Sequence, residues 1–179
     1  MRPLLASSLF LLLAGSALAA DPKIEHLTAV ANGPQVSVRF GLSHLFDREE
    51  LLQALQSGAP TGITYVVEIY RDRPNWFDEG IARSRIEIIA TFNSVTREYL
   101  LNYRRDRRLV RSETFSDLTA LQRRMTSVDE PNLFQIGDRR PYKLKVRAKA
   151  DLTKGWLFYI IPWDSSTHWA SVRVKSEGQ

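Results

Sequence analysis

The chain has 179 residues, a formal net charge of +5 and no cysteine. This length is typical of one domain, which can bury a core without covalent cross-links. The lack of cysteine excludes a disulfide-stapled scaffold and a lipid anchor attached through cysteine.

The first twenty residues have the pattern of a cleaved signal peptide. Arg2 supplies a positive start, and Leu4–Leu13 is an apolar run too short to span a membrane. Ala17-Leu18-Ala19 supplies the small residues that a signal peptidase recognises, so we expect cleavage after Ala19, with Ala20 as the alternative. An uncleaved N-terminal anchor is the weaker interpretation. We therefore expect a periplasmic protein with a signal peptide at 1–20, a single domain at 21–179 and no transmembrane span in the mature chain.

Strand and turn signals alternate along the rest of the chain. An irregular strand at Ile24–Ala31 and an alternating strand at Gln35–Leu42 flank Asn32-Gly33, which predicts a hairpin. Three later segments are rich in β-branched and aromatic residues and are predicted to form the middle of one antiparallel sheet. They are Ile63–Tyr70, Ile81–Phe92 and Arg97–Tyr103.

Two short helices interrupt the strands. Asp47 is the predicted cap of the first helix, which Gly58 ends, and Ser116-Asp117 begins the second. Asp129-Glu130-Pro131-Asn132 is expected to stop the second helix. Because strands with turn signals dominate, the sequence predicts a mainly β fold: an antiparallel immunoglobulin-like β-sandwich with two short helices.

Basic residues concentrate in the second half of the chain. Residues 21–96 carry ten acids and seven bases, whereas residues 97–149 carry fourteen bases and seven acids. For an exported protein, such a field favours lipid head groups, lipopolysaccharide or an acidic protein face over nucleic acid. The candidate surface for an anionic partner is Lys143, Lys145, Arg147, Lys149, Arg104, Arg105, Arg107 and Arg108.

The first four of these bases alternate with Tyr142, Leu144, Val146 and Ala148, so a strand would place them on one face. The four arginines at 104–108 surround Asp106 on a predicted hairpin tip, which should be solvated and mobile. The basic strand face is either a binding ladder or a solvated face whose lysines discourage edge pairing. A final strand is expected at Ala170–Val174.

Aromatic residues in loops allow two interpretations. Trp76 and Phe77 follow the central strand, where they either plug the end of the sandwich or present an anchor to a partner.

No motif for catalysis, cofactor binding or phosphate binding is present. His26, His44 and His168 have no metal-ligand spacing. One loop holds Asp164, Ser165, Ser166 and His168, and four residues of a single loop are a poor basis for a catalytic triad. We therefore expect no cofactor and no metal, with an enzyme of unrecognised type as a third interpretation.

Several segments resemble an uncharacterised family of exported bacterial proteins, domain of unknown function 4390. They are Val67-Glu68-Ile69-Tyr70-Arg71, Trp76-Phe77-Asp78-Glu79, Thr96–Leu101, Phe115–Leu118 with Ala120-Leu121, Tyr142–Arg147 and Trp169-Ala170-Ser171. The resemblance implies export, no known activity and frequent encoding near a membrane-bound sensor kinase. It supplies no catalytic residues.

These observations predict a non-enzymatic periplasmic binding protein of unknown ligand, accessory to envelope signalling. The alternative is a module that contacts envelope lipid or lipopolysaccharide through its basic face.

Overall fold

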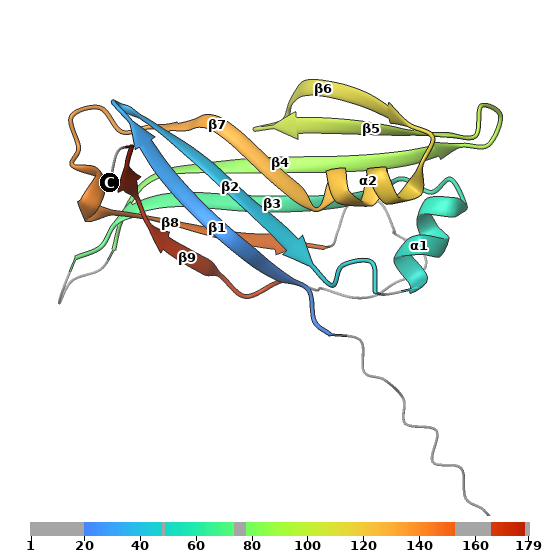
Figure 1. The fold of residues 1–179 in the computed structure, drawn as a ribbon, viewed down its shortest axis with the longest axis horizontal. Coiled ribbons are helices and arrows are strands. Elements are labelled where there is room, and N and C mark those ends of the chain that lie inside the picture. The colour runs from blue at the N-terminus through green and yellow to red at the C-terminus, as the bar shows by residue number, and fades with distance from the viewer. Residues whose placement is uncertain (1–19, 48, 74–77, 153–165, 178–179) are drawn as a thin grey trace, which may run out of the picture.

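The computed structural model describes residues 20–47, 49–73, 78–152 and 166–177. These residues form two β-sheets packed face to face, with two short helices near one end (Figure 1). The smaller sheet has the order β10-β1-β2-β7 and the larger sheet the order β6-β5-β4-β3-β8-β9. The strands are β1 (Lys23–Asn32), β2 (Gln35–Ser43), β3 (Thr61–Arg71), β4 (Glu79–Asn93), β5 (Glu98–Arg105), β6 (Arg108–Phe115), β7 (Ser127–Gln135), β8 (Leu144–Asp151), β9 (Ala170–Arg173) and β10 (Lys175–Ser176).

The predicted sandwich is confirmed for the described residues. Its strands pair antiparallel except β1 and β10, which are parallel. The immunoglobulin-like arrangement is not confirmed. Four neighbours in the larger sheet, β6-β5-β4-β3, are consecutive in the chain, whereas an immunoglobulin domain distributes its strands between sheets through Greek-key connections.

The first hairpin forms where the turn residues predict it. Gly33 has a φ of +57°, a backbone conformation that glycine adopts without a steric penalty. The predicted irregularity of the first strand is a register shift between Glu25 and Thr28, where His26 has a φ of +54°.

The predicted hairpin tip at 104–108 turns at two residues with positive φ, Asp106 at +49° and Arg107 at +69°, as in a type I′ turn. The Asp106 carboxylate accepts hydrogen bonds from the Ser84 hydroxyl at 3.1 Å and from the Arg85 N–H at 2.8 Å. The tip is exposed to solvent, as expected, and it is tied to β4 by these bonds.

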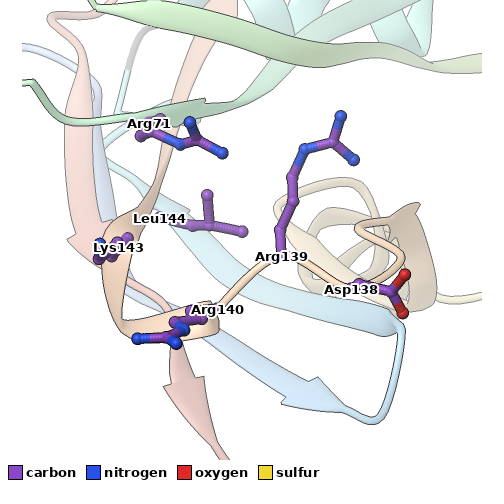
Figure 2. Close-up of a pocket in the computed structure, with 6 residues that line it drawn as sticks. All are labelled: Arg71, Asp138, Arg139, Arg140, Lys143 and Leu144. Atoms are coloured by element: carbon purple, nitrogen blue, oxygen red, sulfur yellow. The ribbon is translucent and has the colours of Figure 1, made fainter.

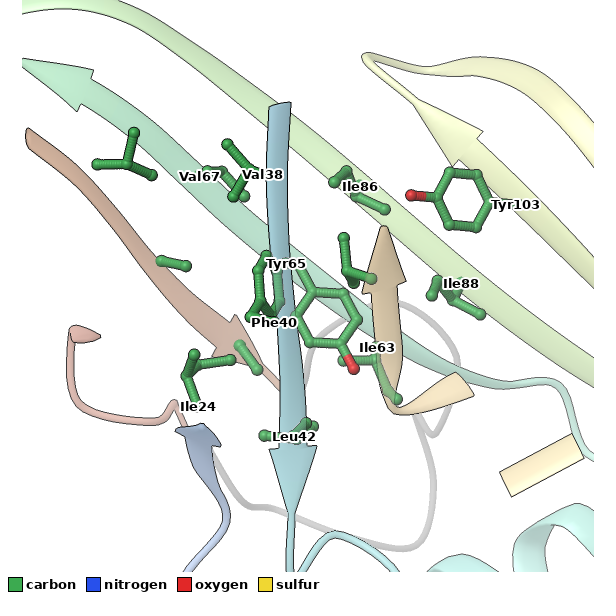
Figure 3. Close-up of a cluster of buried hydrophobic side chains, with 14 of the residues drawn as sticks. Ile24, Val38, Phe40, Leu42, Ile63, Tyr65, Val67, Ile86, Ile88 and Tyr103 are labelled. Atoms are coloured by element: carbon green, nitrogen blue, oxygen red, sulfur yellow. The ribbon is translucent and has the colours of Figure 1, made fainter. Parts of the chain in front are cut away.

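The core lies between the sheets and consists of alternate residues of the facing strands (Figure 3). Phe40 of β2 and Tyr65 of β3 meet edge-on, with ring centroids 5.3 Å apart and planes at 66°. The Tyr65 hydroxyl donates a 2.9 Å hydrogen bond to the carbonyl of Met125. The polar atom of this fully buried ring is therefore satisfied, which removes the cost of burying it.

A buried polar network joins the sheets on one side of the sandwich. Glu130 of β7 is only 4% exposed. Its carboxylate accepts a 2.6 Å hydrogen bond from the Tyr103 hydroxyl and a 2.8 Å hydrogen bond from the Arg105 guanidinium. The guanidinium of Arg111 lies 4.2 Å from the centroid of the Tyr103 ring. Because Tyr103 and Arg105 belong to β5, these bonds tie the larger sheet to the smaller one.

The opposite side of the sandwich is closed by the chain itself. After β9, the N–H of Val174 donates to the Leu144 carbonyl at 3.0 Å. β10 then lies beside β1, and the N–H of Glu177 donates to the Ala31 carbonyl at 2.9 Å. One short segment is therefore hydrogen-bonded to both sheets.

Both predicted helices form. They are α1 (Glu49–Gln56) and α2 (Leu118–Met125). The carboxylate of Asp117 caps α2 by accepting the Ala120 N–H at 2.7 Å. The inner side of α2 buries Leu121 and Met125.

The prediction for Asp129–Asn132 is wrong, because this segment does not stop a helix but lies within β7. The helix ends at Met125, and Pro131 and Asn132 suggested a break. β7 is an edge strand, where proline is tolerated because its missing N–H would face outward. A register shift against β2 between Val36 and Val38 accommodates the irregular backbone, which has a φ of +55° at Asn132.

The strand predicted from Tyr142 begins two residues later than expected. Pro141–Lys143 is a single turn of 3₁₀ helix, η1, and β8 starts at Leu144. Proline at the start of the turn has a φ suited to a helix, which explains the difference. Lys143 is therefore not on the β8 ladder.

The two buried tyrosines predict a loss of stability in alkali. Burial raises the pKa of Tyr65, and burial together with Glu130 raises the pKa of Tyr103. The unfolded chain ionises these phenols near pH 10 and then binds fewer protons than the folded chain. The contribution of these two phenols to the free energy of unfolding is therefore constant below about pH 10 and falls as the pH rises above it.

Urea unfolding at increasing pH measures this loss. Tyr65→Phe should cost about 1 kcal/mol at neutral pH through its lost hydrogen bond, but should show a shallower fall above pH 10. Tyr142→Phe is the control, since this ring is 51% exposed and its pKa is lowered rather than raised, so its removal should not make the fall shallower. An unchanged alkaline slope in Tyr65→Phe would contradict the assignment.

Candidate functional site

Three of the predicted basic residues do share the outer face of β8, but each meets a carboxylate. Lys145 lies 2.7 Å from Asp72, Arg147 lies 2.7 Å from Glu68, and Lys149 lies 2.7 Å from Asp151. The hydrogen bond to Asp72 raises the pKa of Lys145. The positive charges of Lys145, Arg147 and Lys149 are therefore each offset by a neighbouring carboxylate.

The outer face of β8 also carries an aromatic contact. The Arg147 guanidinium lies 4.6 Å from the Trp169 ring centroid and 5.3 Å from that of Tyr70. The ammonium of Lys149 lies 5.5 Å from the Trp169 ring, which is 40% exposed. Such contacts order both cations along an apolar ring.

The hairpin tip does not join this face. Arg104 is opposite Glu87 of β4, and β3 lies between β4 and β8. Arg105 turns inward to Glu130, while Arg107 and Arg108 are exposed. The eight predicted residues therefore do not form one site. The other predicted contact, Trp76 and Phe77, lies outside the described residues.

A second group of basic residues gathers at the end of the sandwich where β3 ends and β8 begins. We call this the basic cleft, a cavity of about 560 Å³. It is lined by Arg71, Asp138, Arg139, Arg140, Lys143 and Leu144. Figure 2 shows Arg139 extending across the cleft toward the strand that carries Arg71, with Leu144 between them.

The loop between β7 and η1 is shaped to present these bases. Gly137 has a φ of +57°, which turns the chain after β7. The Arg139 guanidinium donates to the carbonyl of Ile136 at 3.1 Å, and the Lys143 N–H donates to the carbonyl of Arg140 at 3.1 Å. These bonds fix the loop locally, so its cations are positioned rather than merely close in sequence.

The charges in the basic cleft do not balance. Four cationic side chains and one carboxylate line the cleft. Figure 2 shows that the carboxylate, which belongs to Asp138, is directed away from Arg71. Nη1 of Arg71 lies 3.4 Å from Glu79, which also pairs with Arg73. Among the described residues, Nε of Arg71 is buried without a hydrogen-bond partner. Convergent, incompletely paired guanidinium groups are the arrangement that binds anions.

A neighbouring cavity of about 600 Å³ shares the wall formed by Arg71, Lys143 and Leu144. Its other lining residues are Asp72, Arg73, Tyr142, Lys145 and Arg173. This cavity has an aromatic wall, because the Tyr142 ring is half exposed, so a ligand could place an anionic group in the basic cleft and an organic part beside Tyr142.

Sequence reasoning found Lys143 and missed the other cations of the basic cleft. Arg71 ends one strand, and Arg139-Arg140 stand directly before Pro141. A basic residue at a strand end and two adjacent arginines before a proline indicate a cluster of charge near turns. The alternating basic residues of 143–149 form the clearer pattern, and the prediction followed them.

The described part of the chain contains no group of three or more His, Cys, Asp or Glu residues that could hold a metal ion. Within the same ranges, no helix is long and apolar enough to cross a membrane.

The fold defines a mainly β sandwich protein with two short helices and a basic cleft at one end. The chain belongs to the family described as "Domain of unknown function (DUF4390)", which matches residues 19–172. This match confirms the resemblance found in the sequence. No curated protein and no solved structure matches the chain.

The contact between Arg140 and Tyr142 at the rim of the cleft predicts a lowered pKa for the tyrosine. The Arg140 guanidinium donates a 3.0 Å hydrogen bond to the Tyr142 hydroxyl and holds the pKa of this phenol below its usual value. Arg140→Gln should therefore move the Tyr142 titration to higher pH, as measured from its ring resonances by nuclear magnetic resonance. Arg123→Gln on α2 is the control with the same charge change, and an equal shift there would show a general field effect.

Proposed function

We propose that this protein is an exported, non-enzymatic binding protein that meets an anionic partner of the bacterial envelope through its basic cleft. The single observation that carries the proposal is the excess of cations in the cleft: four bases and one carboxylate line a cavity at the end of a packed sandwich. The groups lining it are suited to holding an anion rather than to activating a nucleophile.

Export is supported by the order of the N-terminal residues. The basic start, the apolar run and Ala17-Leu18-Ala19 follow the pattern that a signal peptidase reads. A role accessory to envelope signalling is the function that the sequence resemblance suggests for such an exported protein.

A second candidate is direct contact with envelope lipid or lipopolysaccharide through the outer face of β8. The observation that favours it is the exposed ring of Trp169, which both Arg147 and Lys149 contact. An amphipathic ring flanked by cations suits the boundary between head groups and acyl chains. The pairing of both cations with Glu68 and Asp151 makes this face less basic than the cleft.

Export predicts a processed protein in the periplasmic fraction. N-terminal sequencing of the protein purified from cells that express the full sequence should begin at Ala20, or at Asp21 for the alternative cleavage. A cytoplasmic enzyme serves as the fractionation control. Material that begins at Met1 and stays in the cytoplasm would disprove export.

Anion binding through the cleft predicts that Arg139→Gln/Arg140→Gln weakens capture of envelope components. The matched control is Arg97→Gln/Arg123→Gln, which removes the same charge at residues for which the described structure shows no side-chain hydrogen bond or ion pair. Capture by the wild-type protein should fall steeply as salt rises, because charge pairs at a surface are screened.

The comparison uses the same envelope extract and quantifies the captured material at low and high salt. Equal capture by the cleft variant and the control variant would exclude the basic cleft as the contact. Circular dichroism melting curves of both variants exclude unfolding as the cause of a difference.

A further inference from the structure

We propose that the basic cleft binds a phosphate monoester, with Arg71 and Arg139 as the two guanidinium groups that hold its phosphate. The inference rests on the proposed function, since it names the ligand class of the same site.

Arg71 has unused hydrogen-bonding capacity. Its only described ion pair is the 3.4 Å contact with Glu79, and this carboxylate also meets Arg73. Its Nε is buried without an acceptor among the described residues. An N–H group that has lost water without gaining a partner is costly, so a small rotation of the guanidinium toward a bound anion would supply what it lacks.

Arg139 lines the cleft with most of its donors available. One N–H group of its guanidinium is used in the 3.1 Å bond to the Ile136 carbonyl, which holds the end of the side chain to its own loop. Figure 2 shows the side chain directed across the cleft toward β3. A guanidinium group has five N–H donors, so the remaining donors can form the paired bonds that tetrahedral oxyanions accept.

The net charge of the cleft favours a dianion. Arg71, Arg139, Arg140 and Lys143 line it against the carboxylate of Asp138. Glu79 beside Arg71 is shared with Arg73, so an excess of positive charge remains. A carboxylate ligand would offset one of these positive charges, whereas a phosphate monoester carries nearly two negative charges at neutral pH. Its three terminal oxygens can also accept from both arginines at once, which a planar carboxylate does less well.

The second cavity indicates an ester rather than inorganic phosphate alone. It adjoins the cleft through Lys143 and Leu144 and is lined by the ring of Tyr142. The phosphate would lie between the two arginines, and the alcohol part of the ester would lie against Tyr142. Phosphate monoesters occur both as soluble metabolites and as lipids with a terminal phosphate. The two kinds of ligand share the chemistry that the cleft would recognise.

Titration calorimetry with three soluble probes tests the ligand class. The probes are glycerol 3-phosphate, inorganic phosphate and succinate, each added to the protein purified from cells that express the full sequence. Glycerol 3-phosphate should bind most tightly, and about tenfold more tightly than succinate, which corresponds to one additional charge-assisted hydrogen bond. Equal affinity for glycerol 3-phosphate and succinate would overturn the proposal, as would the failure of every phosphate probe, the vesicles described below included.

Variants test the two named residues. Arg139→Gln and Arg71→Lys should each weaken glycerol 3-phosphate binding by about tenfold, the second because lysine keeps the charge but loses the paired donors. Arg123→Gln on α2 removes the same charge as Arg139→Gln but far from the cleft, so this variant should bind glycerol 3-phosphate as the wild-type protein does. Arg139→Lys should bind better than Arg139→Gln, which separates loss of an anion contact from loss of folding. Wild-type affinity in Arg139→Gln would refute the assignment.

Vesicles distinguish the source of the phosphate. Phosphatidic acid has a terminal phosphate monoester, phosphatidylglycerol only a diester, and phosphatidylcholine no net charge. Binding to phosphatidic acid above phosphatidylglycerol, and tighter than to glycerol 3-phosphate, would assign a lipid ligand. Tighter binding of the soluble ester would assign a soluble one. If all phosphate probes fail while Arg139→Gln/Arg140→Gln still abolishes envelope capture, the phosphate proposal falls and the proposed function stands.

Discussion

The pairing of the buried carboxylate of Glu130 is the constraint on which the arrangement of the two sheets most depends. A carboxylate that is 4% exposed is costly unless hydrogen bonds and an opposite charge compensate for its lost water. Tyr103 and Arg105 provide both, and they lie on the same strand of the larger sheet. β7 must therefore lie where its glutamate reaches β5, which fixes one sheet relative to the other.

The fold features that the sequence predicted are those set by neighbouring residues. Gly33 specifies its turn because the backbone conformation is unfavourable for other residues, and Asp117 caps α2 because the N–H group it binds is three residues away. β7 was missed because its evidence is not local. Pro131 and Asn132 suggest a break, and only the backbone pairing with β2, which is distant in the sequence, makes the segment a strand.

The charged surface illustrates the same limit. The alternation of basic and apolar residues correctly predicted that Lys145, Arg147 and Lys149 lie on one face of a strand. Their neutralisation depends on register, because Arg147 meets Glu68 only when β8 pairs with β3 in the observed alignment. The basic cleft is assembled from the end of β3, the loop before η1 and the start of β8, so no single stretch of sequence could reveal it.

The route of the last strand has a consequence for how the chain folds. β1 is among the first residues of the sandwich, yet one of its edges is completed only by β10 and by the hydrogen bond from Glu177. Contacts between distant parts of a chain form slowly, since the loop they close must first lose its conformational freedom. During synthesis the sandwich therefore stays incomplete until its final strand emerges. Until β10 is available, the backbone groups of that edge of β1 depend on water for their hydrogen bonds.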